Sequence, residues 1–205
     1  LLARVPKTGR GAVVYVGLIS MLASLLSWGF SLVFGGLLVR ALARREALSM
    51  DYRAAGASAY LGLGAVWAMG LSSSAAQLQA NPASMPPGLV EITGVLPFTE
   101  TIFLWQSIAL TAALILVSLL IAWLTAPGTA TARTAKHFEG AARAEAEPLP
   151  PRTRPGEWLE YSPLLTVLLS LLAFGWLFGE FASKPVVTAI ANLNTYNFLF
   201  ISLGL

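Results

Sequence analysis

A cluster of uncharged polar side chains interrupts an apolar part of this sequence. Residues 60–71 are apolar enough to lie in lipid, but the ten residues that follow carry hydroxyl and amide groups and no charge. These polar residues are Ser72, Ser73, Ser74, Gln77, Gln79 and Asn81. Hydroxyls and amides in a water-poor interior need hydrogen-bond partners. We therefore predict that this segment binds a ligand, with all of these residues except Gln79 as candidate binding residues.

The glycines before the cluster favour a break in the helix. Gly62, Gly64 and Gly70 allow either close packing or a departure from helical geometry, and the serines follow Gly70 almost directly. An unwound helix exposes backbone N–H and C=O groups, and discontinuous membrane helices form the binding sites of many secondary transporters. A second interpretation stays open. The small residues would then only bring helices together, with each serine bonding back to its own helix.

A second candidate site lies near the middle of the first apolar stretch, residues 11–39. Ser27, Trp28 and Gly29 begin the sequence Ser-Trp-Gly-Phe-Ser, which offers a place for the chain to turn. We include these three as candidate binding residues. The alternative role for Trp28 is ordinary packing, and for Ser27 it is the capping of a helix.

The composition indicates an integral membrane protein. The chain is 56% hydrophobic and only 11% charged, whereas a soluble domain carries about 25% charged residues. Residues 54–132 contain no Lys or Arg, and their only acids are Glu91 and Glu100. The apolar stretches span residues 11–39, 54–76, 102–123, 162–181 and 186–205.

The first stretch is too long for one upright crossing. Its 29 residues would form a helix of about 44 Å, whereas the hydrocarbon core of a bilayer is about 30 Å thick. Basic residues flank both of its ends, and short cytoplasmic loops collect Lys and Arg. They are Arg4, Lys7 and Arg10 before it and Arg40, Arg44, Arg45 and Arg53 after it. We therefore predict a re-entrant hairpin that turns within residues 27–31, with arms of three to four turns. A long tilted helix is the alternative.

The other stretches complete the topology. Residues 54–76 start in the cytoplasm after Asp51, a predicted helix N-cap, and residues 77–101 lie outside because they lack Lys and Arg. Lys184 alone departs from this charge rule. We divide the chain into residues 1–125 (the hairpin, the broken helix and the following transmembrane helix), 126–161 (a mobile, charged cytoplasmic linker) and 162–205 (further helices). Because it starts without Met and stops inside an apolar run, it reads as a piece of a longer protein.

Several other classes of function find no support in the sequence. No pair of acids or histidines lies at membrane depth for acid–base catalysis, and the serines have no neighbouring base, so we expect no enzyme. His137 has no second ligand spaced for a metal, and Cys is absent. No basic–aromatic pattern indicates nucleic-acid binding. Asn192, Asn194 and Asn197 fit either interfacial positions or a polar lining.

Three stretches match a known pattern. They read LLSWGFSLVFGGLLVRALARR, DYRAAGASAYLGLGAVWAMGLSSSAAQLQANP and EITGVLPFTETIF. Together they resemble the short-chain fatty acid transporter family, which includes acetoacetate and butyrate permeases. The most specific parts are the Trp-Gly-Phe tip, the glycine-rich segment that ends in serines, the Asn81-Pro82 pair and the stretch that holds Gly94, Pro97 and Thr99. The resemblance covers nearly the whole chain, from about Tyr15 to Leu205, and implies that the family's earliest helices and most of its second half lie outside it.

More distantly, the pattern is similar to the ion transporter superfamily of dicarboxylate and citrate carriers. That likeness implies two inverted repeats, each with a re-entrant hairpin and an unwound helix, in a homodimer. Residues 11–39 would be the first hairpin, residues 54–76 the broken helix, and residue 162 the start of the second repeat. The dicarboxylate carriers place Ser-Asn-Thr at the tip, where this chain has Ser27-Trp28-Gly29. That difference argues against a sodium site at the tip and fits a smaller, less charged substrate.

The sequence therefore predicts an all-α polytopic membrane protein that is part of an inverted-repeat secondary transporter. The resemblance implies transport of short-chain fatty acids, such as butyrate and acetoacetate-like monocarboxylates, across a bacterial inner membrane, with the broken helix receiving the carboxylate. No cofactor is expected, and the coupling ion, H⁺ or Na⁺, is left open. The alternatives are a carrier of dicarboxylates or another small anion, and a structural membrane subunit whose small residues only mediate packing.

Overall fold

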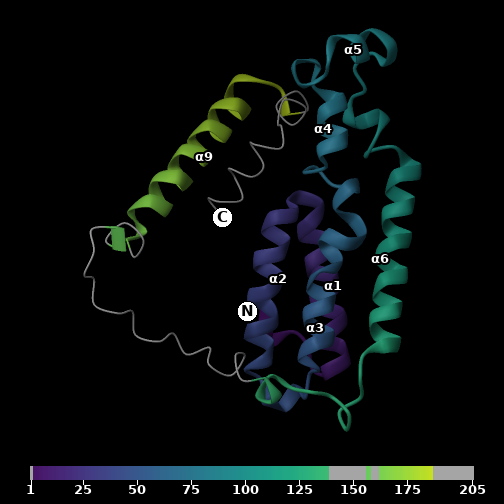
Figure 1. Ribbon diagram of the computed structural model, residues 1–205, viewed down its shortest axis with the longest axis vertical. Coiled ribbons are helices and arrows are strands. Elements are labelled where there is room, and N and C mark those ends of the chain that lie inside the picture. The colour runs from purple at the N-terminus through teal and green to yellow at the C-terminus, as the bar shows by residue number, and fades with distance from the viewer. Residues whose placement is uncertain (1, 139–155, 158–161, 187–205) are drawn as a thin grey trace. The chain divides into compact units, whose positions relative to one another are not determined.

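The chain forms helices and no strands in residues 2–138, 156–157 and 162–186, which are the residues that the computed structural model describes (Figure 1). Four helical segments in this part of the chain are long and apolar enough to cross a membrane: Gly9–Leu26, Tyr52–Ala80, Trp105–Thr125 and Pro163–Ser183. The prediction of an all-α polytopic membrane protein is confirmed. Residues 187–205 of the last predicted helix, with its three asparagines, lie outside the described residues.

The helices belong to two compact units. The first unit comprises Leu1–Ser72 and Ile102–Glu145, and the second comprises Ser73–Thr101 and Ala146–Leu205. The first unit holds α1 (Gly9–Leu26), α2 (Trp28–Ala43), α3 (Tyr52–Ala59) and α6 (Trp105–Thr125), with short 3-10 turns at Leu2–Arg4, Glu46–Leu48 and Ala135–His137. The second holds α4 (Ser74–Ala80), α5 (Pro87–Thr93) and α9 (Pro163–Ser183), with short 3-10 turns at Pro82–Ser84 and Phe98–Glu100.

Helices α1 and α2 form a hairpin and pack along each other (Figure 1). The single residue between them is Ser27, whose backbone is extended (φ −151°, ψ 120°). The predicted turn therefore lies inside residues 27–31 but is shorter than predicted, because Trp28 already starts α2. The arms have 18 and 16 residues, which is longer than the predicted three to four turns. Both helices continue beyond the apolar stretch, to Gly9 and Ala43.

The second apolar stretch is a discontinuous helix. After α3, the chain forms a π-helical turn over Gly62–Val66 and a 3-10 turn over Trp67–Met69. The backbone becomes extended at Gly70 (φ −99°, ψ 174°), and α4 begins only at Ser74. The break that the glycines and serines predict is therefore present, at residues 70–73.

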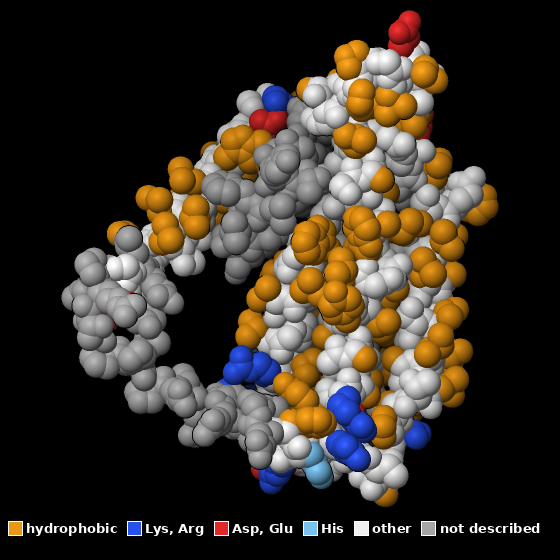
Figure 2. All heavy atoms as spheres, in the orientation of Figure 1, with side chains coloured by type: hydrophobic (Ala, Val, Ile, Leu, Met, Phe, Trp, Pro, Cys, Tyr) orange, Lys and Arg blue, Asp and Glu red, His pale blue; other side chains and the backbone are white. Residues whose placement is uncertain are grey.

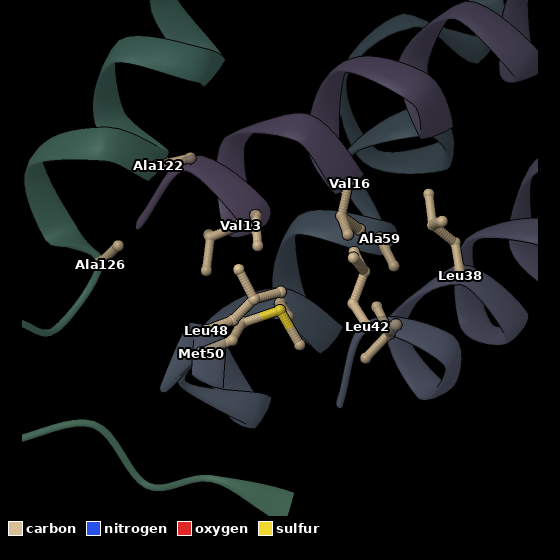
Figure 3. Close-up of a cluster of buried hydrophobic side chains, with 12 residues drawn as sticks. Val13, Val16, Leu38, Leu42, Leu48, Met50, Ala59, Ala122 and Ala126 are labelled. Carbon is tan, nitrogen blue, oxygen red and sulfur yellow. The ribbon is translucent and has the colours of Figure 1, made fainter. Parts of the chain in front are cut away.

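A buried apolar cluster joins all four helices of the first unit (Figure 3). Val16 of α1 and Leu42 of α2 are fully buried in it, and Met50 from the connection to α3 is buried beside them. The buried members from α3 and α6 are alanines, since small side chains let helices approach closely. The buried members are Ala12, Val13, Val16, Leu38, Val39, Leu42, Leu48, Met50, Ala55, Ala59, Ala122 and Ala126.

Polar contacts close one end of the first unit. Asp51 caps α3 as predicted, because its carboxylate accepts hydrogen bonds from the N–H groups of Arg53 and Ala54 at 3.1 and 3.0 Å. The same carboxylate accepts from the backbone N–H of Arg133 at 2.9 Å, which attaches the segment after α6 to the start of α3. Arg45, just after α2, donates to the carbonyls of Ala3 and Pro6 before α1. Both ends of the hairpin therefore lie at the same end of this unit.

The pKa of Asp51 lies below its usual value of 3.8. Burial of the carboxylate raises the pKa. The hydrogen bond from the Arg53 side chain and those from the backbone N–H groups of Ala54 and Arg133 lower it by more. Asp51 is therefore a carboxylate at neutral pH.

The two remaining apolar helices follow their predicted ranges closely. Helix α6 runs from 105 to 125 where residues 102–123 were predicted, and α9 runs from 163 to 183 where residues 162–181 were predicted. Ser162 caps α9 by accepting from the N–H of Leu164. Lys184 after α9 pairs with Glu180. Most of the predicted linker, residues 139–155 and 158–161, lies outside the described residues.

Candidate functional site

The tip of the α1–α2 hairpin and the break after Gly70 are joined by two hydrogen bonds within the first unit. The backbone N–H of Leu71 donates to the carbonyl of Leu25, at the end of α1, at 2.7 Å. The backbone N–H of Trp28, at the start of α2, donates to the hydroxyl oxygen of Ser72 at 3.1 Å. The two segments that the sequence singled out are therefore neighbours in space. Ser27, Trp28 and Ser72 come together there.

Gly70 allows this approach. A Cβ atom at Gly70 would lie 2.6 Å from both the Cα and the carbonyl oxygen of Leu25. Real Cβ atoms do not come that close to backbone atoms, so any side chain here would push the hairpin tip and the break apart. The glycine is required for the junction itself, which is a more specific role than general flexibility.

The first turn of α2 is organised around Ser27. Its hydroxyl oxygen accepts from the N–H of Phe30 at 3.4 Å, so Ser27 is the N-cap that one sequence interpretation foresaw. Ser27 is buried, whereas Trp28 and Gly29 are half-buried. A Cβ atom at Gly29 would meet nothing within 4 Å. The tip therefore presents the N-terminal end of α2 beside open space, and a helix N-terminus carries partial positive charge.

The other candidate residues lie in the second unit. Ser73 caps α4 by accepting from the N–H of Ala76 at 3.5 Å, and it is buried. Gln77 is buried on α4, whereas Ser74 at the start of the helix is exposed. The side chain of Asn81 accepts from the N–H of Ala83 and caps the following 3-10 turn. Binding roles for these four residues, and for Ser27, Trp28, Gly29 and Ser72, stay predictions.

Three further serines that we did not select from the sequence lie inside the hairpin. Ser20, Ser24 and Ser31 are all fully buried. Ser31 donates to the carbonyl of Ser20 at 2.7 Å, while the hydroxyl oxygens of Ser20 and Ser24 make no hydrogen bond among the described residues. With Ser27 they recur at spacings of four, three and four residues. That spacing is the helical period that could have identified them.

Gly62 in the π-helical turn packs directly against this serine row. A Cβ atom there would lie 2.3 Å from the hydroxyl oxygen of Ser31 and 2.5 Å from the carbonyl oxygen of Ser20. The discontinuous helix therefore contacts the hairpin at Gly62 as well as at Gly70. The serine row and the junction at the tip form one polar seam between the two elements, and we call it the tip–break seam.

The tip–break seam can donate hydrogen bonds but carries no charge. Its side chains are serine hydroxyls, and its backbone groups are those of the α2 N-terminus and the break. Among the described residues, no group of three or more His, Cys, Asp or Glu side chains could hold a metal ion. Such a set of donors suits an anion that hydrogen bonds and helix dipoles can hold without a cationic partner.

Residues 1–205 match the model of a protein family that is described as "Short chain fatty acid transporter". The chain belongs to this family. The resemblance drawn from the tip and the glycine-rich segment is thereby confirmed. Short chain fatty acid transporters are transport proteins, which supports the expectation that the chain is not an enzyme.

Two curated relatives of the short chain fatty acid transporter family are similar to the chain. A protein of Escherichia coli (strain K12) is 31% identical over 205 residues, which cover 99% of this chain and 44% of the relative. A protein of Haemophilus influenzae is 30% identical over 130 residues, which cover 62% of this chain and 29% of the relative. Both carry the name "Putative short-chain fatty acid transporter". The chain thus spans less than half of their length. No solved structure matches it.

Proposed function

We propose that the chain forms part of a secondary transporter that moves short-chain monocarboxylates across the bacterial inner membrane. Its membership of the short chain fatty acid transporter family supports transport of short-chain fatty acids. The single observation that carries the proposed site is the junction at which Trp28 donates to Ser72. At this junction the N-terminus of α2 lies beside the break in the second helix, and neither Trp28 nor Ser72 carries a charge.

In this proposal the carboxylate of the substrate lies at the tip–break seam. The N-terminal end of α2 attracts the negative charge, and the hydroxyls of the broken helix donate to the carboxylate oxygens. The helix N-terminus and the hydroxyls are sufficient for a monoanion with a short aliphatic tail, because the tail carries no second charge to balance. A dianion would leave one carboxylate facing neutral groups in a water-poor interior, at a large cost in desolvation.

The proposal includes a re-entrant hairpin. Both ends of the hairpin lie at one end of the first unit, since Arg45 bonds to Ala3 and Pro6. That end also carries the basic residues that short cytoplasmic loops collect. The tip would then reach into the membrane from the cytoplasmic side, where its irregular backbone is covered by the broken helix. A homodimer of the complete protein also remains part of the proposal.

The experiment is uptake of labelled butyrate by the complete protein in proteoliposomes, compared with the double variant Ser72→Ala/Ser73→Ala. We expect the Michaelis constant of the variant to rise at least several-fold while expression stays near that of the wild type. Thermal stability should fall only by the cost of the lost hydrogen bond at Ser72 and the lost cap at Ser73. The matched control is Ser170→Ala on α9, whose hydroxyl donates to the carbonyl of Thr166 in its own helix. Unchanged uptake by the double variant would rule out this site.

A further inference from the structure

A groove runs along the outer face of α2 and α3 in the first unit. Its volume is about 620 Å³, which is within the range of about 300–1,000 Å³ typical of small-molecule sites. Its walls are apolar and come from residues such as Val33 and Leu37 of α2 and Tyr60 just after α3. Since these side chains are exposed in a chain that spans a membrane, the groove faces outward from the packed core.

Two exposed glycines line the groove. Gly36 of α2 and Gly56 of α3 both line it, and a Cβ atom at either position would meet no atom within 4 Å. The groove therefore exists because side chains are missing at these two positions. Packing does not require either glycine, in contrast to Gly70. Larger side chains could fill the groove without disturbing the helices.

One end of the groove carries a positive charge without a protein partner. Arg40 of α2 lines the groove and is exposed. Among the described residues it makes no hydrogen bond and no ion pair, whereas Arg45 bonds to two carbonyls and Arg53 pairs with Asp51. Figure 2 shows Lys and Arg side chains gathered at this end of the unit, with hydrophobic side chains over the rest of the face. None of the described residues that line the groove is acidic.

We propose that this groove binds an anionic phospholipid, with its phosphate on Arg40 and one acyl chain lying between α2 and α3. Basic pockets between membrane helices on the cytoplasmic side bind anionic head groups. The acyl chain is surrounded by apolar atoms both in the groove and in the bilayer, so it contributes little selectivity. Selectivity comes from the head group and Arg40, while occupancy depends on the open space at Gly36 and Gly56.

The experiment is native mass spectrometry of the complete protein with an equimolar mixture of phosphatidylglycerol and phosphatidylcholine that carry the same acyl chains. We expect the wild type to retain phosphatidylglycerol about fivefold over phosphatidylcholine. Arg40→Gln should bring that ratio close to one. Arg44→Gln is the matched control, because it removes the same charge at the C-terminal end of α2 but does not line the groove.

A second variant tests occupancy separately. Gly36→Leu/Gly56→Leu should lower the retention of both lipids, whereas Gly175→Leu on α9, an equally open glycine outside the groove, should not. The proposal is overturned if the wild type does not prefer phosphatidylglycerol, or if Arg40→Gln keeps that preference. It is equally overturned if Gly36→Leu/Gly56→Leu retains as much lipid as the wild type. It is also overturned if Leu37→Cys forms a cross-link to another helix of the complete protein, because the groove would then be occupied by protein.

Discussion

The hydroxyl oxygen of Ser72 accepts a hydrogen bond from the backbone N–H of Trp28 at 3.1 Å, across 44 residues of chain. The bond joins the first residue of a helix to a break in another helix. Trp28 N–H is one of the donors that a helix start leaves without an intrahelical partner. Ser72, which belongs to the broken helix, therefore supplies the acceptor that the N–H of Trp28 needs at the hairpin tip. One side chain thus connects the two parts of the proposed site.

Replacing Ser72 should separate its structural role from its role in binding. Ser72→Ala should lower the free energy of unfolding by about 1 kcal/mol, because the N–H of Trp28 loses its acceptor. Ser72→Thr keeps the hydroxyl and should retain most of that stability. Thermal unfolding in detergent, measured beside butyrate uptake, checks both. Equal stability of wild type and Ser72→Ala would show that the hydrogen bond contributes nothing.

Gly70 should tolerate no side chain. Gly70→Ala should lower the free energy of unfolding by about 1–3 kcal/mol, since its Cβ would overlap the backbone of Leu25. Butyrate uptake should fall with it, because the hairpin tip and the break must move apart. Gly64→Ala is the control, since a Cβ atom there meets nothing within 4 Å. Equal thermal unfolding and uptake of Gly70→Ala and Gly64→Ala would contradict the assignment of Gly70 to the close approach at the tip–break seam.

The Asp51 carboxylate should make stability depend on pH in the acid range. Its folded pKa lies below the value of about 3.9 expected for an unfolded chain. Its contribution is therefore fully present above that value and is lost as the pH falls through the lower folded pKa. Melting temperatures of wild type and Asp51→Asn, measured between pH 7 and pH 3, should differ at pH 7, and the difference should shrink as the pH falls below about 3.9. A constant difference would contradict this assignment.

The two ends of the hairpin should be accessible from the same side of the membrane. In a version of the complete protein without other cysteines, Lys7→Cys and Arg44→Cys should react with an impermeant maleimide from the cytoplasmic side. Gly88→Cys on α5, within the segment predicted to lie outside, should react only from the opposite side. Labelling of Lys7→Cys and Arg44→Cys from opposite sides would mean that the hairpin is a crossing and would favour a structural subunit.

Much of the first unit could be predicted from local signals. The length of the first apolar stretch and the basic residues at both of its ends predicted a turn that the structure places at Ser27. Asp51 before an apolar run predicted a cap, and Gly70 followed by serines predicted the break. Each of these features depends on residues that are close in sequence, where capping and backbone freedom act directly.

The contacts across the seam could not be predicted in the same way. The pairing of Trp28 with Ser72 and the approach of Gly62 to Ser20 depend on how two helices pack, which local propensity does not fix. The groove at Gly36 and Gly56 could not be predicted for the same reason. In the sequence, a glycine that leaves a surface open cannot be told from one that allows close packing. Only the spacing of the buried serines carried a usable signal.

Uptake of labelled butyrate by the complete protein in proteoliposomes tests the proposed function most directly. The assay should be run under a proton gradient and under a sodium gradient, with acetoacetate and succinate as competitors. We predict uptake that acetoacetate inhibits and succinate does not, because the tip–break seam offers neutral donors for a single carboxylate. Inhibition by succinate would move the substrate to dicarboxylates. No uptake under either gradient would contradict the proposal that this chain belongs to a working monocarboxylate transporter.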